Sequence, residues 1–261
     1  MNILFTVCGR AGSKGLKNKN LKNMLGVPLL YYTLSVIDLF AREKRAVDNV
    51  FVCVNSDSKE LLELACRQRF LPVYPIERCA ELSGDRVAKA LVIKDCLEKA
   101  AGHFNVKPDI VVDLDITSPI RTVQDVSGAI EMKRCNRDFD IVFSAVPSRR
   151  SPYFNMVIRN EKEDRYSLVV PSGFTARQSV PKAYDMNASI YVYESRFLSE
   201  RSAPRLFDGK NTIIKMRDTA VLDIDSEEDF ELMEVIVRHL LETWPALKSV
   251  FNNACRLSEG S

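Results

Sequence analysis

Short apolar runs alternate along the chain with longer segments whose apolar residues recur every three or four positions. Four runs rich in Val, Ile and Phe have the length of buried strands: residues 2–8, 50–55, 108–115 and 140–146. The segments between and after them have the spacing of amphipathic helices: residues 28–40, 58–70, 86–102 and 123–135. Ser58 and Asp85 are the expected N-caps, and Gly102 is an expected C-cap. This alternation predicts right-handed strand–helix–strand units, and therefore an α/β, three-layer fold with a mainly parallel sheet covered on both faces.

The alternation stops near Pro147. Residues 147–186 have the pattern of two strands around a charged turn, which predicts an inserted β-rich arm that meets a partner, with a long flap as the alternative. The final helix is expected at about 227–242, after Ser226 and with acidic residues in its first turn. We therefore expect one domain over residues 1–244, with the arm embedded at about 147–186. Residues 245–261 are expected to form a C-terminal extension that is partly disordered.

Composition excludes several classes of protein. A net charge of +2 argues against wholesale binding of nucleic acid, so any basic feature must be local. No stretch approaches the roughly 18–20 apolar residues of a membrane span, so we expect no membrane partner. Seven cysteines without a C-x-x-C pair predict reduced thiols in a cytoplasmic protein. The two histidines, His103 and His239, are far apart, which disfavours a zinc site and a Ser-His-Asp triad.

A glycine-punctuated basic loop follows the first predicted strand. Its five basic residues are Arg10, Lys14, Lys17, Lys19 and Lys22, and its three glycines are Gly9, Gly12 and Gly15. No acidic residue precedes Asp38. Ligands of parallel sheets bind beyond the carboxyl ends of the strands, and glycines let backbone amides approach an anion closely. The loop therefore predicts a polyphosphate site in which Arg10 and Lys19 hold separate phosphates; a solvated lysine-rich loop is the alternative.

Paired aspartates are candidates for a metal site. Asp223 and Asp225 flank Ile224, so on an extended segment both carboxylates point to one side. Hard oxygen ligands beside a triphosphate suit Mg²⁺. The alternative is that Asp225 or Ser226 only caps the final helix. Asp113 and Asp115, near the end of a central strand, form a second pair with the same spacing.

The opening loop also resembles a known family. GRAGSKGLKNKN at 9–20 is similar to the R-x-G-S-K-G-x-x-x-K-N signature of the acylneuraminate cytidylyltransferases, which activate nine-carbon 2-keto sugar acids as CMP-sugars for cell-surface glycans. Further segments resemble the family's motifs in the same order: residues 77–85, 113–121, 176–184, 186–193 and 223–230. The resemblance implies a nucleotide-diphospho-sugar transferase-like fold, CTP as substrate, Mg²⁺ as cofactor and pyrophosphate as product. It also implies a homodimer in which the arm of one subunit helps to close the neighbour's site.

The resemblance assigns roles to individual residues. It implies that Arg10 and Lys19 hold the triphosphate, that Asn20 reads the base and that Arg78 lies near the cytosine. The nucleotide-binding set is completed by Gly12, Ser13 and Lys14. The expected catalytic residues are Arg10, Lys19, Asp223 and Asp225, of which the two aspartates hold the metal.

The sugar pocket needs a cation of its own, because the sugar acid carries a carboxylate. Arg177 is the expected partner, and Arg121 is a second possibility that could instead pair with the following helix. The further residues expected to contact sugar are Thr117, Gln178, Asp185 and Asn187. The tyrosines near this segment, Tyr184 and Tyr191, could contact sugar but are more typical of a core or an interface.

Two departures from the sialic-acid members bear on the substrate. Those members carry Gln in place of Asp115 and often Arg in place of Asp185. Asp115 has two open interpretations, as a third metal ligand with Asp223 and Asp225 or as a sugar contact, and we favour the metal. The variants resemble the legionaminic-acid branch, which predicts N,N′-diacetyllegionaminic acid as the sugar. The alternatives are a CMP-N-acetylneuraminic acid synthase, a metal-dependent glycosyltransferase that uses Asp113 and Asp115, and a nucleotide-binding regulator without catalysis.

Overall fold

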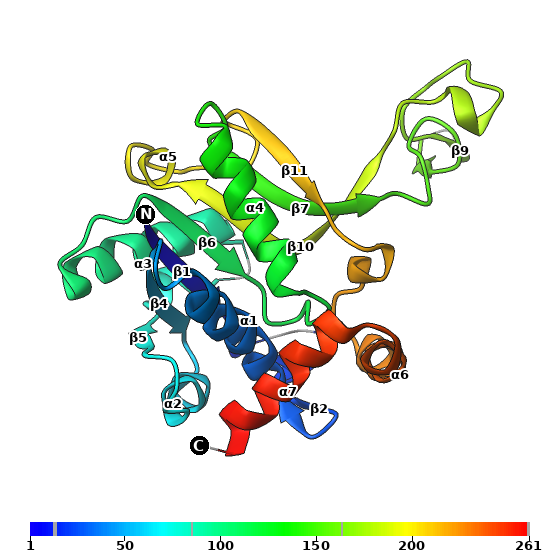
Figure 1. The fold of residues 1–261 in the computed structure, drawn as a ribbon. Coiled ribbons are helices and arrows are strands. Elements are labelled where there is room, and N and C mark those ends of the chain that lie inside the picture. The colour runs from blue at the N-terminus through cyan, green and yellow to red at the C-terminus, as the bar shows by residue number, and fades with distance from the viewer. Residues whose placement is uncertain (13–14, 85, 163, 260–261) are drawn as a thin grey trace.

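A seven-stranded sheet forms the centre of the molecule (Figure 1). The computed structural model describes residues 1–12, 15–84, 86–162 and 164–259. The strands of the sheet, in spatial order, are β11 (Asn211–Lys215), β7 (Ile141–Pro147), β10 (Tyr184–Glu194), β6 (Ile110–Leu114), β1 (Asn2–Cys8), β4 (Asn49–Ser56) and β5 (Tyr74–Glu77). Within the described residues, β10 alone runs antiparallel to its neighbours in this sheet. The prediction of a mainly parallel sheet is confirmed.

Helices cover both faces of the sheet, as the alternating sequence predicted (Figure 1). The helices are α1 (Leu29–Lys44), α2 (Lys59–Arg67), α3 (Lys89–Phe104), α4 (Val123–Cys135), α5 (Ser195–Ser199), α6 (Glu227–Thr243) and α7 (Pro245–Glu259). Successive residues of a strand point to opposite faces. In β1, Phe5 therefore joins the core beneath α1, α4 and α7, whereas Leu4 joins the smaller core beneath α3 and α5. No helix among the described residues is long and apolar enough to span a membrane.

The helix ends follow local capping chemistry. Ser58 caps α2 by accepting a hydrogen bond from the Leu61 amide, as predicted. A reciprocal capping box at Ser226 and Asp229 starts α6 close to the predicted position. The prediction that Gly102 ends a helix was wrong, because α3 continues to Phe104 and Asn105 supplies the left-handed residue, with φ 51°. Asp85, the other predicted cap, lies outside the described residues.

Short elements connect the sheet to the rest of the chain. They are the ribbon β2 (Asn23–Met24) and β3 (Val27–Pro28), and the 3₁₀ turns η1 (Lys19–Leu21), η2 (Ala80–Leu82), η3 (Arg177–Ser179) and η4 (Asp218–Val221). Between β7 and β10 the chain leaves the sheet and forms an antiparallel ribbon of β8 (Val157–Asn160) and β9 (Arg165–Leu168). This ribbon projects away from the sheet (Figure 1). Its location coincides with the predicted β-rich arm.

The end of the chain belongs to the main core. The sequence placed a domain boundary at residue 244, but α7 packs against α1 and buries a row of apolar side chains: Leu247, Val250, Ala254 and Leu257. A polar contact fixes the pair of helices, because the Ser35 hydroxyl donates to the Val250 carbonyl at 2.7 Å. Residues 245–259 are therefore continuous with the domain. Partial disorder was predicted for residues 245–261. Of these, residues 260–261 lie outside the described residues.

One residue of β10 has an unusual backbone. The register between β10 and β7 shifts between Met186 and Tyr191, and within this irregularity Ala188 has φ 52°. A side chain with a Cβ atom is strained in this left-handed region, by roughly 1–2 kcal/mol. The position corresponds to the Gly of the N-G-A motif in the resembled family, so the backbone geometry explains why glycine is suited to it.

Candidate active site

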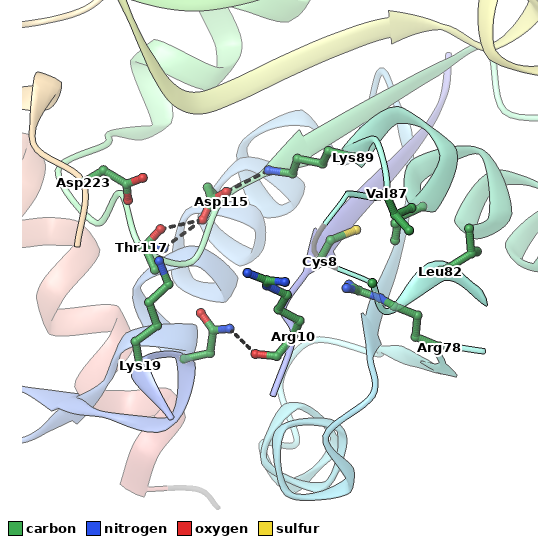
Figure 2. A pocket seen from close by; sticks show the side chains of 13 residues that line it. Cys8, Arg10, Lys19, Arg78, Leu82, Val87, Lys89, Asp115, Thr117 and Asp223 are labelled. Carbon is green, nitrogen blue, oxygen red and sulfur yellow. Dashed lines mark hydrogen bonds and ion pairs between the residues drawn. The ribbon is translucent and has the colours of Figure 1, made fainter. Parts of the chain in front are cut away.

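A cavity of about 250 Å³ lies beyond the carboxyl ends of β1, β5 and β6 (Figure 2). We call it the strand-end cavity. Predicted site residues from four separate parts of the sequence line it: Arg10, Lys19, Asn20, Arg78, Asp115, Thr117 and Asp223. The fold thus brings the basic opening loop and the late aspartate segment to one place, at the edge of the sheet where ligands of parallel sheets bind.

The opening loop is packed closely against the late aspartate segment. A Cβ atom on Gly15 would lie 2.1 Å from the Asp225 carbonyl oxygen, so this approach requires glycine. The Lys19 ammonium donates to the Ile224 carbonyl and to Asp225 Oδ1, both at 2.9 Å. These contacts fix Lys19 at the rim of the strand-end cavity. Gly12 is exposed and does not line the cavity.

Two predicted nucleotide contacts, Ser13 and Lys14, lie outside the described residues. Two others are held in place by their neighbours. Asn20 is buried, and its side-chain amide donates to the Arg10 carbonyl at 3.1 Å. The Arg78 guanidinium donates to the side chain of Asn55 and, at 3.1 Å, to the Asn55 carbonyl. Sequence reasoning missed Asn55, whose only signal was its place at the end of a predicted strand.

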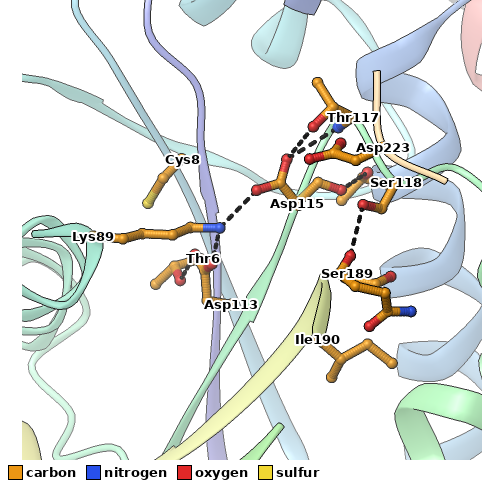
Figure 3. Close-up of polar contacts among 12 residues, drawn as sticks. Thr6, Cys8, Lys89, Asp113, Asp115, Thr117, Ser118, Ser189, Ile190 and Asp223 are labelled. Carbon is orange, nitrogen blue, oxygen red and sulfur yellow. Dashed lines mark hydrogen bonds and ion pairs between the residues drawn. The ribbon is translucent and has the colours of Figure 1, made fainter. Parts of the chain in front are cut away.

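Asp115 and Asp223 lie close together on one side of the cavity, next to Thr117 (Figures 2 and 3). The Thr117 amide and hydroxyl donate to Asp115 Oδ1 at 3.0 and 2.8 Å. The Ile224 amide donates to the Thr117 carbonyl at 3.2 Å, which brings the Asp223 segment to the end of β6. Burial raises the pKa of Asp223, and the negative charge of Asp115 raises it further. The two side chains therefore place two carboxyl groups on this side of the cavity.

Asp225 points away from this pair. Its side chain is 77% exposed, and its carboxylate forms the ion pair with Lys19. The three predicted metal ligands therefore do not form one cluster. Among the described residues, no group of three or more His, Cys, Asp or Glu side chains is arranged to hold a metal. Ser226, rather than Asp225, caps α6.

Lys89, at the first position of α3, is a cavity residue that sequence reasoning missed. Its ammonium lies 2.7 Å from Asp115 Oδ2 and 2.8 Å from Asp113 Oδ2 (Figure 3). Burial alone would lower the pKa of Lys89, but the two carboxylates raise it well above its usual value. Burial alone would raise the pKa of Asp115, but Lys89 and Thr117 hold it well below its usual range. Both side chains are therefore charged at neutral pH.

The residues expected to hold a sugar carboxylate lie elsewhere. Arg177 and Gln178 line a second cavity of about 450 Å³ at the base of the arm, which we call the arm cavity. Three further cations line it: Arg150, Lys182 and Lys215. No Asp or Glu among the described residues belongs to its lining. Neither Arg177 nor Gln178 lines the strand-end cavity of the same chain.

Other residues expected near the sugar have different surroundings. Asp185 is exposed and lies in a hollow with Arg149 and Asp218. Asn187 is 2% exposed, and its amide donates to the Ala220 carbonyl at 2.9 Å, so in this structure it braces β10 against η4.

Arg121, the alternative carboxylate partner, is also buried. Its guanidinium donates to the Ser189 and Asp115 carbonyls at 2.8 and 3.1 Å and to the Thr33 hydroxyl. Burial lowers its pKa to about 10. It positions the backbone of Asp115 and is not available to a ligand in this conformation.

Comparison with known proteins decides the family. Residues 4–254 match the family described as Cytidylyltransferase. The chain belongs to the cytidylyltransferase family. The match runs from β1 into α7 and so spans the residues of the strand-end cavity and of the arm.

Curated relatives of this family match over most of the chain. A CMP-N,N′-diacetyllegionaminic acid synthase from Campylobacter jejuni is 37% identical over 240 residues, which cover 90% of this chain and 94% of the relative. A post-translational flagellin modification protein B from Campylobacter coli is 35% identical, covering 90% and 95%. An N-acylneuraminate cytidylyltransferase from Streptococcus agalactiae is 26% identical, covering 88% of this chain and 52% of the relative.

Solved structures support the same fold. A CMP:2-keto-3-deoxy-manno-octonic acid synthetase complexed with CTP has a TM-score of 0.62 at 15% identity, covering 92% of this chain and 99% of the other. A 4-diphosphocytidyl-2C-methyl-D-erythritol synthase from Anaerococcus prevotii has a TM-score of 0.59 at 12% identity, covering 91% and 99%. At these identities the likeness concerns the fold.

Proposed function

We propose that this cytidylyltransferase transfers the cytidylyl group of CTP to a nine-carbon 2-keto sugar acid, giving a CMP-sugar and pyrophosphate. The observation that carries the proposal is the strand-end cavity. It combines cations for a triphosphate, Arg10 and Lys19, with the neighbouring carboxylates Asp115 and Asp223. The relatives named as CMP-sugar synthases support the same reaction class.

The sugar we propose is N,N′-diacetyllegionaminic acid. The legionaminic acid synthase is 37% identical to this chain, whereas the N-acylneuraminate cytidylyltransferase is 26% identical. Asp115 and Asp185, which differ from the sialic-acid pattern, are consistent with this choice. N-acetylneuraminic acid is the competing substrate.

The mechanism rests on positioning and on charge. The anomeric hydroxyl oxygen of the sugar acid attacks the α-phosphorus of CTP and forms a new P–O bond. The bond between the α-phosphorus and the oxygen bridging to the β-phosphate breaks, so that pyrophosphate leaves, and the hydroxyl proton is released to water. Arg10 and Lys19 hold the phosphates and stabilise the charge that grows on the leaving pyrophosphate. Loss of one charge-assisted contact of this kind costs roughly 1.5–3 kcal/mol. Arg78, fixed by Asn55, lies on the side of the cavity away from Asp223 (Figure 2), where the base would lie.

The donor set of the cavity fits Mg²⁺. Asp115 Oδ1 and the Asp223 carboxylate are hard oxygens, and Mg²⁺ is commonly held by one or two carboxylates together with substrate phosphates. Burial and the nearby charge of Asp115 raise the pKa of Asp223, and a divalent ion would neutralise the negative charge that the two carboxylates carry together. We therefore propose Asp115 and Asp223 as its ligands and give Asp225 the role of orienting Lys19. When bound, the ion would lower the charge of the α-phosphate that the hydroxyl attacks.

We propose a homodimer in which the arm of each subunit completes the partner's site. Beside Arg177 and its neighbouring cations, no described Asp or Glu lines the arm cavity, which suits a sugar carboxylate. Large apolar side chains are exposed on the arm: Met156, Val157, Ile158, Tyr166, Val169 and Phe174. Exposed apolar surface of this extent on a projecting ribbon is typical of a protein–protein interface.

The deciding experiment is pyrophosphate release from CTP with a panel of 2-keto sugar acids. N,N′-diacetyllegionaminic and N-acetylneuraminic acids are compared side by side, with and without EDTA. The proposal expects release that requires Mg²⁺ and a higher kcat/KM for the legionaminic acid. Preference for N-acetylneuraminic acid would overturn the sugar assignment alone, and release unaffected by EDTA would overturn the metal site alone. No release with any 2-keto acid would overturn the function.

A further inference from the structure

One ammonium group bridges the two carboxylates at the end of β6. Asp113 and Asp115 occupy alternate positions of the extended chain, so both can face α3. Lys89 Nζ lies 2.8 Å from Asp113 Oδ2 and 2.7 Å from Asp115 Oδ2 (Figure 3). A cation that contacts one oxygen of each of two neighbouring carboxylates has the position that a bridging divalent ion would take.

The remaining carboxylate oxygens have separate partners. Asp113 is fully buried, and its Oδ1 accepts a hydrogen bond from the Thr6 hydroxyl at 2.7 Å. Asp115 Oδ1 accepts from Thr117, on the side of Asp223 (Figure 3). The Lys89 ammonium therefore contacts one oxygen of Asp113 and one oxygen of Asp115. The other oxygen of Asp115 lies on the side of Asp223.

The site has acidic groups for more than one cation. Asp113, Asp115 and Asp223 together carry three negative charges, and the Lys89 ammonium compensates one of them. Two-metal transferases place two cations about 3.5–4 Å apart, so that they clamp both the attacking and the leaving oxygen. In this chain an ammonium stands where a second ion could bridge Asp113 and Asp115. It also lines the strand-end cavity, where it adds positive charge beside Arg10.

We propose that Lys89 fills the second cation position of the active site, so that each subunit binds one divalent ion, through Asp115 and Asp223. This inference rests on the proposed magnesium site. Lys89 acts as a positioning residue: it excludes a second ion and holds the carboxylates of Asp113 and Asp115 in place. The Lys89 ammonium lies 5.4 Å from the centre of the Tyr191 ring, a cation–π contact that holds it at this place.

Mn²⁺ binding to the nucleotide-free protein, measured by electron paramagnetic resonance, tests the inference without any turnover. Wild type is expected to bind one Mn²⁺ per chain. Lys89→Met frees two carboxylate oxygens and is expected to bind two. Lys89→Arg keeps the charge and is expected to bind one.

Two control variants show whether the additional Mn²⁺ ion expected in Lys89→Met is due to the loss of Lys89. Lys94→Met lies on the same helix, where Lys94 contacts Glu98 and the Arg201 carbonyl, and is expected to retain one ion. The double variant Lys89→Met with Asp113→Asn removes one of the freed carboxylates, and it too is expected to bind one. If Lys89→Met does not fold in metal-free buffer, excess Mn²⁺ is expected to restore its circular dichroism spectrum.

The outcomes separate this inference from the proposed function. One Mn²⁺ in both wild type and Lys89→Met would overturn the role of Lys89 and leave the magnesium site intact. A Lys89→Met protein that stays unfolded in excess Mn²⁺ would also overturn it. If the double variant still binds two Mn²⁺ ions, the second ion does not bind between Asp113 and Asp115, and the proposal is overturned. A wild type that binds no Mn²⁺ would overturn the magnesium site itself, whatever Lys89→Met binds.

Discussion

Among the residues that the structure describes, four cations line the strand-end cavity and four line the arm cavity, yet their surroundings differ. Arg10, Lys19, Arg78 and Lys89 line the first, and Arg150, Arg177, Lys182 and Lys215 line the second. In the strand-end cavity Lys19 and Lys89 pair with carboxylates of the same chain, and Arg78 is fixed by Asn55. In the arm cavity Arg177 donates to the Arg149 carbonyl, and no carboxylate of the described residues lines the space.

The difference indicates how much of each site one chain can form. Paired and hydrogen-bonded side chains are held in place before a ligand arrives, which lowers the entropic cost of binding. The strand-end cavity is of this kind, so we expect a single subunit to bind CTP. Cations without acidic partners repel one another until an anion joins them. We therefore expect the arm cavity to form a complete binding site only when the sugar carboxylate is bound and the neighbouring subunit is in place.

The largest expected effect comes from combining two variants that are each strongly impaired. Asp223→Asn removes a proposed metal ligand and is expected to lower kcat by about 100-fold or more. Arg177→Ala removes the proposed carboxylate partner and should lower kcat/KM for the sugar by about 10- to 100-fold. When the two are co-expressed, mixed dimers hold one site with both residues intact. About a quarter of the wild-type activity should return, because half of the dimers are mixed and each has one intact site.

The readout is pyrophosphate release at saturating CTP. Lys162→Ala, at the turn of the ribbon, serves as the control for Arg177→Ala and is expected to keep wild-type rates. Activity that stays at the level of the separate variants after co-expression would mean that the arm acts within its own chain, and the comparison above would be broken.

A smaller effect is expected from Lys19. Lys19→Met removes the ammonium that contacts Ile224 and Asp225, and we expect kcat/KM for CTP to fall by about 10- to 100-fold. Lys17→Met changes an exposed lysine of the same loop and should alter kcat/KM less than threefold, as is typical of a screened surface charge. Steady-state kinetics with varied CTP measures both. Equal losses in the two variants would indicate that only the total charge of the loop matters.

The proposed dimer is tested by a change on the arm. Ile158→Asp places a charge on the exposed apolar ribbon, and we expect the subunits to separate while CTP binding persists. Val47→Asp alters an equally exposed residue outside the arm and should leave the assembly unchanged. Light scattering reports the mass and calorimetry reports CTP affinity. A monomeric Ile158→Asp protein that no longer binds CTP would contradict the view that one chain completes the strand-end cavity.

The smallest expected effect concerns stability. Ala188→Gly relieves the left-handed strain in β10, and we expect the free energy of unfolding to rise by about 0.5–1 kcal/mol after the added freedom of the unfolded chain is subtracted. Ala176→Gly, at a residue with φ −132°, gains no such relief and should lower stability. Urea denaturation measures both. If both substitutions destabilise the protein alike, Ala188 is not strained.

Local sequence patterns predicted the sheet and its helices well, because strand length and helical spacing are properties of single segments. The run 123–135 became α4 with the predicted bounds, and 2–8 became β1. Helix ends were harder to predict, since Gly102 is tolerated inside α3 when Asn105 can close the helix. The place of α7 was also missed, because its burial depends on α1, which is distant in the sequence.

The residues of the strand-end cavity were predicted where a motif contains them and missed where only tertiary contacts bring them together. Arg10, Lys19, Asp115 and Asp223 meet in one cavity, as the resemblance implied. No sequence pattern marked Lys89 as a site residue. Its partners Asp113 and Asp115 lie at the end of β6, and they become its neighbours only when α3 packs over β1 and β6. Asn187 shows the reverse: its motif suggested a ligand contact, but packing against η4 buries it.

The arm emerges from the middle of the sheet, since β7 leads into it and β10 returns beside β6. Strand β10 is hydrogen-bonded to a residue of the strand-end cavity, because the Asp115 amide donates to the Ser189 carbonyl at 3.2 Å. Lengthening or shortening the hairpin tip would therefore alter its reach while sparing the chemistry, whereas a single inserted residue near 187–190 would displace Asp115. Variation among homologues in quaternary geometry should accordingly accumulate at the tip, and the root of the hairpin should stay constant in length.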